Sequence, residues 1–383
     1  MAANGSQRRW RSVRRYLNQS RATLTAVAAD LSAGWPRLDS GLIVLPEWLP
    51  PAPVPLDQVR LEWRAEPEPP RVTGVEPGSF LVRPLREDGE RYPDYASALC
   101  EVDPPALLED RPAYRLIETP TDAADARLVC GPARYFEGLN VSEAIAHELA
   151  ALCMATAGRG GRPNLNRTDL PLRNLIGDPA DPGSRPTSLA LCTLTVRHDT
   201  GSGAASFLLH WRDPERVASG GGLYQVAPVG VFQPAPGRGD QAPGEAGPDF
   251  DLWRGVAREL SEELLGAPEH QAPDYADWPF LRQLDQAREK GGCRAWYLGF
   301  GLDPLTLVGD ILTVAVFDAA TFDEVFADLV TANEEGRLVS EGDGVGVAFT
   351  EENVRRYAGD EPMQPAGAAL LELAWRHRAA LLG

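Results

Sequence analysis

The sequence is poor in basic residues, and lysine is almost absent. Lys290 is the only lysine among 383 residues, and the other 36 of the 37 basic residues are arginines. They face 55 acidic residues, which gives a formal net charge of −18. Proteins that bind duplex DNA usually carry a basic balance or a basic face, so nucleic acid is not the expected partner. Because the net charge repels anions, an anionic substrate would have to be bound by local arginines or by a metal ion.

Long apolar runs and paired cysteines are also missing. No stretch of eighteen apolar residues occurs, so we expect no membrane-spanning helix and no membrane partner. No apolar core follows the arginines near the N-terminus, which argues against a signal peptide. No zinc-ligand spacing links the cysteines, and we expect buried thiols in a reducing cytoplasm. The cysteines are Cys100, Cys130, Cys153, Cys192 and Cys293.

Several catalytic signatures are absent as well. Lys290 is not preceded by a phosphate-binding loop, and no Gly-x-Ser-x-Gly elbow occurs. The five histidines are scattered, and His147-Glu148 lacks a second histidine at the zinc-protease spacing. The sequence therefore gives no support to a P-loop enzyme, a Ser/His/Asp hydrolase or a zinc protease.

Three parts are expected along the chain. Residues 1–75 combine an amphipathic helix over 7–32 with a Pro-rich connector over 33–75. The basic face of that helix has two open interpretations, a docking element for another macromolecule or the solvated side of a packed helix. Residues 76–184 are predicted to form an α+β region, with weak strand signals at 80–82, 114–117 and 128–130 and a helix capped by Ser142.

Residues 185–383 are more regularly patterned and form the third part. Short apolar runs predict strands at 188–196, 205–211, 223–232, 294–300 and 311–317. Helices are predicted at 251–264, 323–331 and 366–382. This mixed order predicts an α+β sandwich built around a mixed sheet.

The helix at 251–264 carries an unusual group of acidic residues. Glu259, Glu262 and Glu263 are separated by three and four positions, so they project together beside the apolar stripe. Like charges within one turn repel each other, and a bound Mg²⁺ or Mn²⁺ would reverse that cost. Arg258 precedes Glu262 by four positions and can hold it by a charge-assisted hydrogen bond. The alternative is an exposed acidic helix surface.

This segment resembles the Nudix family. The Nudix motif runs Gly, five residues, Glu, seven residues, then Arg-Glu-U-x-Glu-Glu-x-Gly-U, where U is apolar. Residues 258–263 (Arg-Glu-Leu-Ser-Glu-Glu) match its second half. The position of the first Glu is Phe250, between Asp249 and Asp251, and Gly266 comes one place late. Gly230 corresponds to the opening glycine with a lengthened loop after it, in which Glu245 is one candidate for the missing Glu.

The resemblance implies a Nudix-like mixed-sheet α/β/α sandwich over 185–383. It further implies divalent-metal-dependent hydrolysis of a nucleoside diphosphate-linked compound. Glu259, Glu262 and Glu263 would ligate the metal, and Arg258 would orient them. The catalytic base would be a motif carboxylate such as Glu262 or a carboxylate of a later loop, for which Glu334 is the candidate.

Substrate contacts are expected on or beside the strands. Arg212 follows a strand and could meet a phosphate, although it could equally pair with neighbouring acids. Tyr224 and Phe232 could stack on a base, although aromatic residues at such positions also serve as core.

A second function class stays open. Phe250 and the displaced glycine fit a catalytically silent Nudix-like module that binds a nucleotide for regulation or interaction. The segment also looks like Nudix-like domains attached to regulators in actinobacteria. Either protein would be cytoplasmic and would take a small nucleotide derivative as partner, and a homodimer is possible.

Overall fold

The computed structural model describes residues 4–105, 108–157, 165–212, 222–237, 246–269, 274–332, 336–340 and 345–383. The fold is α+β, with one seven-stranded mixed sheet and two three-stranded sheets. The predicted fold class is therefore confirmed.

The main sheet has the strand order β1-β10-β11-β5-β6-β13, and β9 also pairs with β5. The pairing of β11 with β5 is parallel, and the other pairs are antiparallel. Its strands, in chain order, are β1 Val54–Pro55, β5 Leu189–His198, β6 Ala205–Phe207, β9 Val229–Val231, β10 Cys293–Leu302, β11 Gly309–Asp318 and β13 Val347–Ala348.

The two smaller sheets come from different parts of the chain. The N-terminal part supplies the order β2-β4-β3, with β2 Arg60–Trp63, β3 Pro112–Glu118 and β4 Arg127–Arg134. The C-terminal part supplies the order β12-β7-β8, with β7 Leu209–Arg212, β8 Tyr224–Val226 and β12 Gly336–Leu338.

The α-helices surround these sheets. They are α1 Gly5–Gln19, α2 Arg21–Leu31, α3 Tyr95–Val102, α4 Tyr135–Ala157, α5 Pro171–Ile176, α6 Leu252–Leu265, α7 Pro279–Glu289, α8 Ala319–Val325, α9 Glu351–Arg355, α10 Pro365–Arg376 and α11 Arg378–Leu382.

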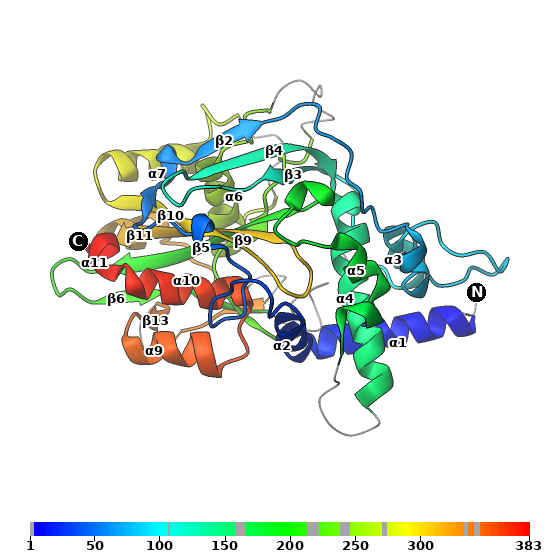
Figure 1. Ribbon diagram of the computed structural model, residues 1–383. Coiled ribbons are helices and arrows are strands. Elements are labelled where there is room, and N and C mark those ends of the chain that lie inside the picture. Colours follow the sequence, from blue (N-terminus) through cyan, green and yellow to red (C-terminus); the bar gives the residue numbers. More distant parts are fainter. Residues whose placement is uncertain are drawn as a thin grey trace.

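The elements stack in layers (Figure 1). Helix α10 covers one face of the main sheet, and α6 and α7 cover the other. The small sheet β2-β4-β3 lies beyond α6, so that α6 is enclosed between two sheets. Helices on both faces give the α/β/α arrangement that the sequence predicts.

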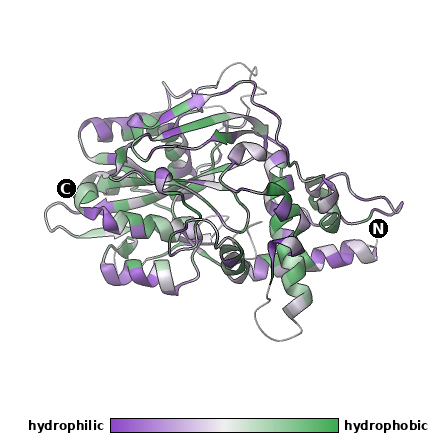
Figure 2. Cartoon of the chain, viewed as in Figure 1, coloured by the Kyte–Doolittle hydropathy of each residue, from purple (hydrophilic) through white to green (hydrophobic). Residues whose placement is uncertain are grey.

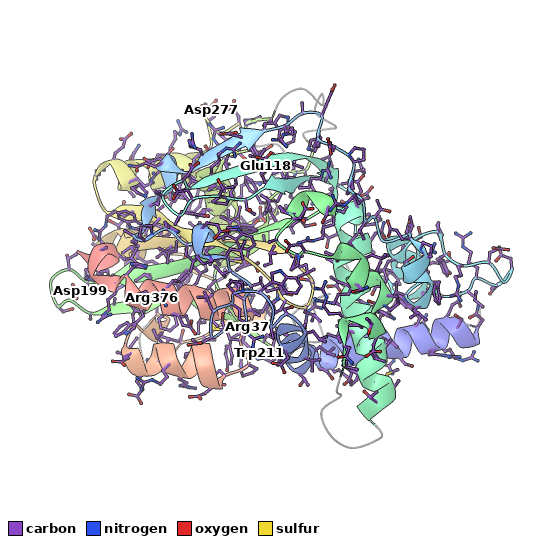
Figure 3. All side chains as sticks on the ribbon, in the orientation of Figure 1. Arg37, Glu118, Asp199, Trp211, Asp277 and Arg376 are labelled. Atoms are coloured by element: carbon purple, nitrogen blue, oxygen red, sulfur yellow. The ribbon has the colours of Figure 1, made fainter. Side chains whose placement is uncertain are left out.

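The β2-β4-β3 sheet has one apolar and one charged face, which explains why it can cover α6. Along β2, Leu61 and Trp63 contribute to the core, while the alternate residue Glu62 pairs with Arg127 of β4 at 2.7 Å. Arg127 also pairs with Glu118 of β3 at 3.3 Å, on the outer side of the molecule (Figure 3). Alternation along a strand places apolar and charged side chains on opposite faces.

One hydrophobic core runs through the N- and C-terminal parts. It extends from Trp10 of α1 to Leu381 of α11, and the strands in the middle of the molecule are largely hydrophobic (Figure 2). A second cluster joins α1 and α2 to α4 through Val13, Leu17 and Leu24. The domain limits proposed from the sequence stay predictions, and the parts that they separate share a core.

Two predicted elements in the N-terminal part differ in the structure. The helix over 7–32 is divided at Ser20 into α1 and α2. The segment over 33–75 is not only an extended connector, because it contains β1, which pairs with β10 of the main sheet, and β2, which pairs with β4.

Three further predictions are wrong in detail. Residues 80–82 form no strand, since Pro77–Leu81 is a 3-10 helix. Ser142 lies inside α4, which begins at Tyr135, so it is no N-cap. The helix predicted over 323–331 spans Ala319–Val325 instead.

The run 205–211 forms two strands, not one. Residues Ala205–Phe207 pair with β5, and Leu209–Arg212 pair with β8 in another sheet. The run 223–232 is likewise divided at Ala227-Pro228 into β8 and β9.

Among the described residues, no helix combines the length and the apolar character that crossing a membrane requires.

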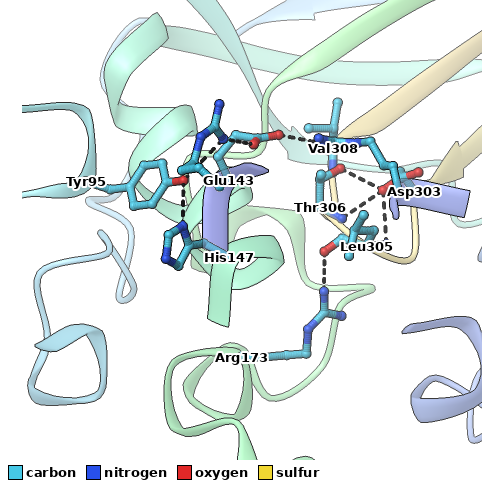
Figure 4. Close-up of polar contacts among 10 residues, drawn as sticks. Tyr95, Glu143, His147, Arg173, Asp303, Leu305, Thr306 and Val308 are labelled. Atoms are coloured by element: carbon cyan, nitrogen blue, oxygen red, sulfur yellow. Dashed lines mark hydrogen bonds and ion pairs between the residues drawn. The ribbon is translucent and has the colours of Figure 1, made fainter. Parts of the chain in front are cut away.

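Buried ion pairs hold the two N-terminal helices on α4. Glu143 of α4 accepts hydrogen bonds from Arg14 at 2.9 Å and from Arg21 at 2.7 Å, and all three side chains are in the interior. Figure 4 shows Glu143 near Tyr95 and His147. Burial alone would raise the pKa of Glu143, but the guanidinium groups of Arg21 and Arg14 lower it to about 2. Two of the arginines of the predicted basic helix are therefore internal, while Arg9 and Arg15 are exposed.

We expect Arg14→Gln to lower the free energy of unfolding by about 3 kcal/mol, because it leaves Glu143 with an incomplete counter-charge in a buried place. Urea denaturation measures the loss. Arg15→Gln on the same helix is the matched control, and it should change stability by less than about 0.5 kcal/mol. Equal effects of the two substitutions would contradict the role given to the buried pair.

His147 adds a pH dependence to this cluster. Its Nδ1 lies 3.2 Å from the Tyr95 hydroxyl, and burial, followed by the charge of Arg14, lowers the pKa of His147 to about 3. His147 is therefore protonated near pH 6.5 in the unfolded chain but stays neutral at that pH in the folded chain. We expect stability to fall as the pH drops from about 6.5 toward 4, and the fall to be smaller in His147→Gln. Urea midpoints across this range measure it, and identical pH profiles would refute the assignment.

Candidate functional site

Helix α6 holds the predicted site residues, and its sequence explains its limits. The Asp251 side chain accepts a hydrogen bond from the backbone N–H of Arg254 at 2.9 Å and caps the first turn. Gly266 ends the helix in a left-handed conformation with φ 63°. The apolar stripe Leu252, Val256, Leu260 and Leu264 is buried. Cap, stripe and terminal glycine together specify this helix.

Close packing fixes α6 on the main sheet. A Cβ atom on Gly255 would lie 2.9 Å from Leu191 of β5, so glycine allows the helix to approach the strand closely. On its other side, the segment before α6 meets the β2-β4-β3 sheet through aromatic rings. The Phe250 ring centroid lies 5.3 Å from that of Trp63 and 5.1 Å from that of Tyr114.

Phe250 therefore has a structural role at the position where the Nudix motif has its first Glu. Its acidic neighbours have other partners. Asp251 is the N-cap of α6, and the fully buried Asp249 accepts a hydrogen bond from the Tyr275 hydroxyl. Glu245, the other candidate for the missing Glu, lies outside the described residues.

Two of the three motif carboxylates point to β9. Glu263 is 9% exposed, and its Oε1 accepts a hydrogen bond from the backbone N–H of Val229 at 2.9 Å. The carboxylate of Glu259 occupies the space beside Gly230, where a Cβ would lie 1.9 Å from the Glu259 Cδ atom. Glu262 is half-buried on the same helix. The structure thus brings Gly230 and Glu259 together, a contact that the sequence did not predict.

These side chains do not form a metal cage in this conformation. Within the part of the chain that the structure describes, no three His, Cys, Asp or Glu residues come close enough together to hold a metal ion. One oxygen of Glu263 is already used by a backbone N–H. The residues present therefore do not fit a bound Mg²⁺ or Mn²⁺ as they stand, and metal ligation by Glu259, Glu262 and Glu263 stays a prediction.

Arg258 has a different partner from the one the spacing suggests. Its Nη2 donates to the carbonyl oxygen of Gln233 at 2.7 Å and not to Glu262. Arg258 is 5% exposed, and its Nε has no hydrogen-bond partner. Arg258 thus ties α6 to the segment after β9, which positions the helix without contacting a motif carboxylate.

Two of the predicted substrate residues lie on neighbouring strands, because Trp211 of β7 is opposite Tyr224 of β8, and the third, Phe232, lies in the core. Arg212 ends β7, and Tyr224 in β8 packs its ring against Tyr357 with centroids 5.3 Å apart. Phe232 is 1% exposed and packs on Tyr114 with centroids 5.0 Å apart, so its ring has no face open to a base. Glu334, the candidate base, lies outside the described residues.

A cavity of about 510 Å³ opens beside the start of α6, and the sequence interpretation did not identify it. Its walls come from the segment Leu56–Leu61, the first residues of α6, Tyr275 and α7. The sequence pattern did not indicate that Trp253 and Arg254, just before the motif, line a cavity. It also did not predict α7. The signal for α7 was present, because Pro279 begins a run in which Leu281, Leu284 and Ala287 have helical spacing and are buried.

Comparison with known proteins adds little. The chain matches no protein-family model and no curated protein. It resembles the solved structure of a NUDIX hydrolase from Alicyclobacillus acidocaldarius, with 17% identity over 49% of this chain and 90% of that chain and a TM-score of 0.25. This is a weak likeness to a Nudix-like fold over half of the chain, and at this TM-score it carries no argument about activity.

The contact between Gly230 and Glu259 can be tested by a double-mutant cycle. Gly230→Ala should lower the free energy of unfolding by about 1 kcal/mol, since the new methyl group displaces the Glu259 carboxylate. In a Glu259→Ala background the same substitution should cost little, because the space is vacant. Urea denaturation of the four proteins measures the coupling. Equal costs in both backgrounds would show that the carboxylate does not occupy this space in solution.

Proposed function

We propose that the chain is a catalytically silent Nudix-like module that binds a small nucleotide derivative. The observation that carries this proposal is the use of Glu263 as a structural acceptor for the Val229 N–H, inside a helix that lies between two sheets. A carboxylate that satisfies a half-buried backbone donor is costly to withdraw, because the donor would lose its partner.

The place of the first motif Glu supports the same proposal. Phe250 belongs to an aromatic group with Trp63, Tyr114 and Phe232. This group joins the N-terminal sheet to the loop where a hydrolase of this family would hold a carboxylate. The N-terminal part of the chain thus stabilises the Nudix-like part where catalytic chemistry would otherwise be expected.

A metal-dependent hydrolase of nucleoside diphosphate-linked compounds is the second candidate. One observation favours it, since Glu259 and Glu262 both retain partial exposure on α6. In that case a divalent cation would have to draw Glu263 away from Val229.

The test combines binding and turnover. Purified protein is mixed with ADP or ADP-ribose and Mg²⁺ or Mn²⁺, its melting temperature is recorded, and products are separated by chromatography. We expect the nucleotide to raise the melting temperature by several degrees, as ligands that bind only the folded state do, and no product to form.

Glu262→Gln is the control for turnover. It should bind nucleotide as the wild type does, since the charge at this position has no role in a silent module. Product from the wild type and none from Glu262→Gln would establish the hydrolase instead. The absence of both a thermal shift and a product would refute both candidates.

A further inference from the structure

The cavity beside α6 has the size and the lining of a small-molecule site. Its volume of about 510 Å³ is within the range of ligand pockets, roughly 300–1,000 Å³. Leu56, Val59, Leu61 and Leu281 give it an apolar wall, and charged side chains of α6 and α7 face it. It lies at the first turn of α6, whereas the motif glutamates begin two turns later.

One wall carries an arginine held on an indole ring. The Arg288 guanidinium lies over the Trp253 ring, 4.6 Å from its centroid. The indole is itself fixed, because its Nε1 donates to Asp285 at 2.7 Å. Asp285 and Arg288 are three positions apart on α7, so one helix face supplies both contacts. The stacking orders the Arg288 side chain before any ligand arrives.

The Arg288 guanidinium has few partners among the described residues. It makes no hydrogen bond to any of them, and its ion pair with Asp57 has the long distance of 3.7 Å between Nη2 and Oδ2. The Arg288 side chain is only 25% exposed, whereas Asp57 is 67% exposed. A partly buried guanidinium with free donors is a site for bidentate binding of a phosphate or carboxylate. Asp57 is free to move away when such a group enters.

A second arginine faces the same space. Arg254, in the first turn of α6, lies over the Tyr275 ring at 4.7 Å and donates from Nη1 to the Pro248 carbonyl oxygen. No described residue accepts a hydrogen bond from its Nη2. Asp251 and Asp285 also line the cavity, but they accept hydrogen bonds from the Arg254 backbone N–H and from Trp253 Nε1. The two ordered guanidinium groups therefore favour an anion, and the apolar wall favours one that carries a flat or apolar group.

We propose that this cavity is the nucleotide site, with Arg288 and Arg254 binding the phosphate groups and the apolar wall receiving the base. Asp57 acts as an internal counter-ion that the phosphate displaces. The inference rests on the proposed nucleotide-binding function and places the ligand away from the acidic residues of α6.

Isothermal titration with ADP and with inorganic pyrophosphate tests this assignment. Arg288→Gln should weaken ADP binding by about tenfold or more, the scale expected for a lost charge-assisted contact. Arg282→Gln, an exposed position on the same helix, is the matched control and should leave the affinity unchanged. Asp57→Asn should tighten binding, because it removes the competing carboxylate. Glu262→Gln should bind as the wild type does.

The outcomes separate the two proposals. If the wild type binds ADP and Arg288→Gln binds it equally well, the cavity assignment is wrong while nucleotide binding stands. The same conclusion follows if Glu262→Gln, and not Arg288→Gln, loses affinity. If pyrophosphate binds in an Arg288-dependent way but ADP and ADP-ribose do not, the anion site is real and the nucleotide function fails. Should Arg288→Gln not fold, Arg288→Lys keeps the charge, loses the bidentate fork, and should show the same direction of change.

Discussion

The enclosure of α6 between two sheets is the constraint on which the rest of the structure depends. Trp253 and Ala257 of α6 are buried next to the apolar stripe Leu252, Val256, Leu260 and Leu264. The N-terminal part contributes Trp63 and Tyr114, whose rings pack on Phe250 just before the helix. Packing on both sides fixes how α6 lies against the sheets, and with it the directions in which its acidic side chains leave the helix.

The same packing gives charged residues structural roles. Glu263 accepts a hydrogen bond from the backbone of β9, and Arg258 donates one to the backbone after β9. Glu143 forms ion pairs with two arginines in the interior. A protein with a net charge of −18 thus keeps several of its charges inside, where each must have a partner. Residues 258–263 resemble the second half of the Nudix motif in sequence, and the contacts found for Arg258 and Glu263 are with backbone groups.

Sequence patterns predicted α6 well, because its cap, stripe and terminal glycine are all local signals. They also predicted the long strands β5, β10 and β11, in which apolar and β-branched residues predominate. They failed where tertiary contacts decide. The residues around Leu208 give no local signal that the apolar run is divided between two sheets. The residues around Ser20 likewise give no signal that one helix ends and another begins there. The partners of Arg258 and Glu263 lie on segments distant in sequence, and the spacing on one helix could not reveal them.

The outermost strands of the main sheet have a consequence for the behaviour of the folded protein. Both β1 and β13 are only two residues long, and β1 ends in Pro55, which has no N–H to offer. At the β1 border, an incoming strand from another molecule therefore meets a two-residue strand that ends without a backbone donor. The Pro-rich segment thus places a residue that disfavours edge-to-edge pairing beside Trp296 and Tyr297 of the sheet.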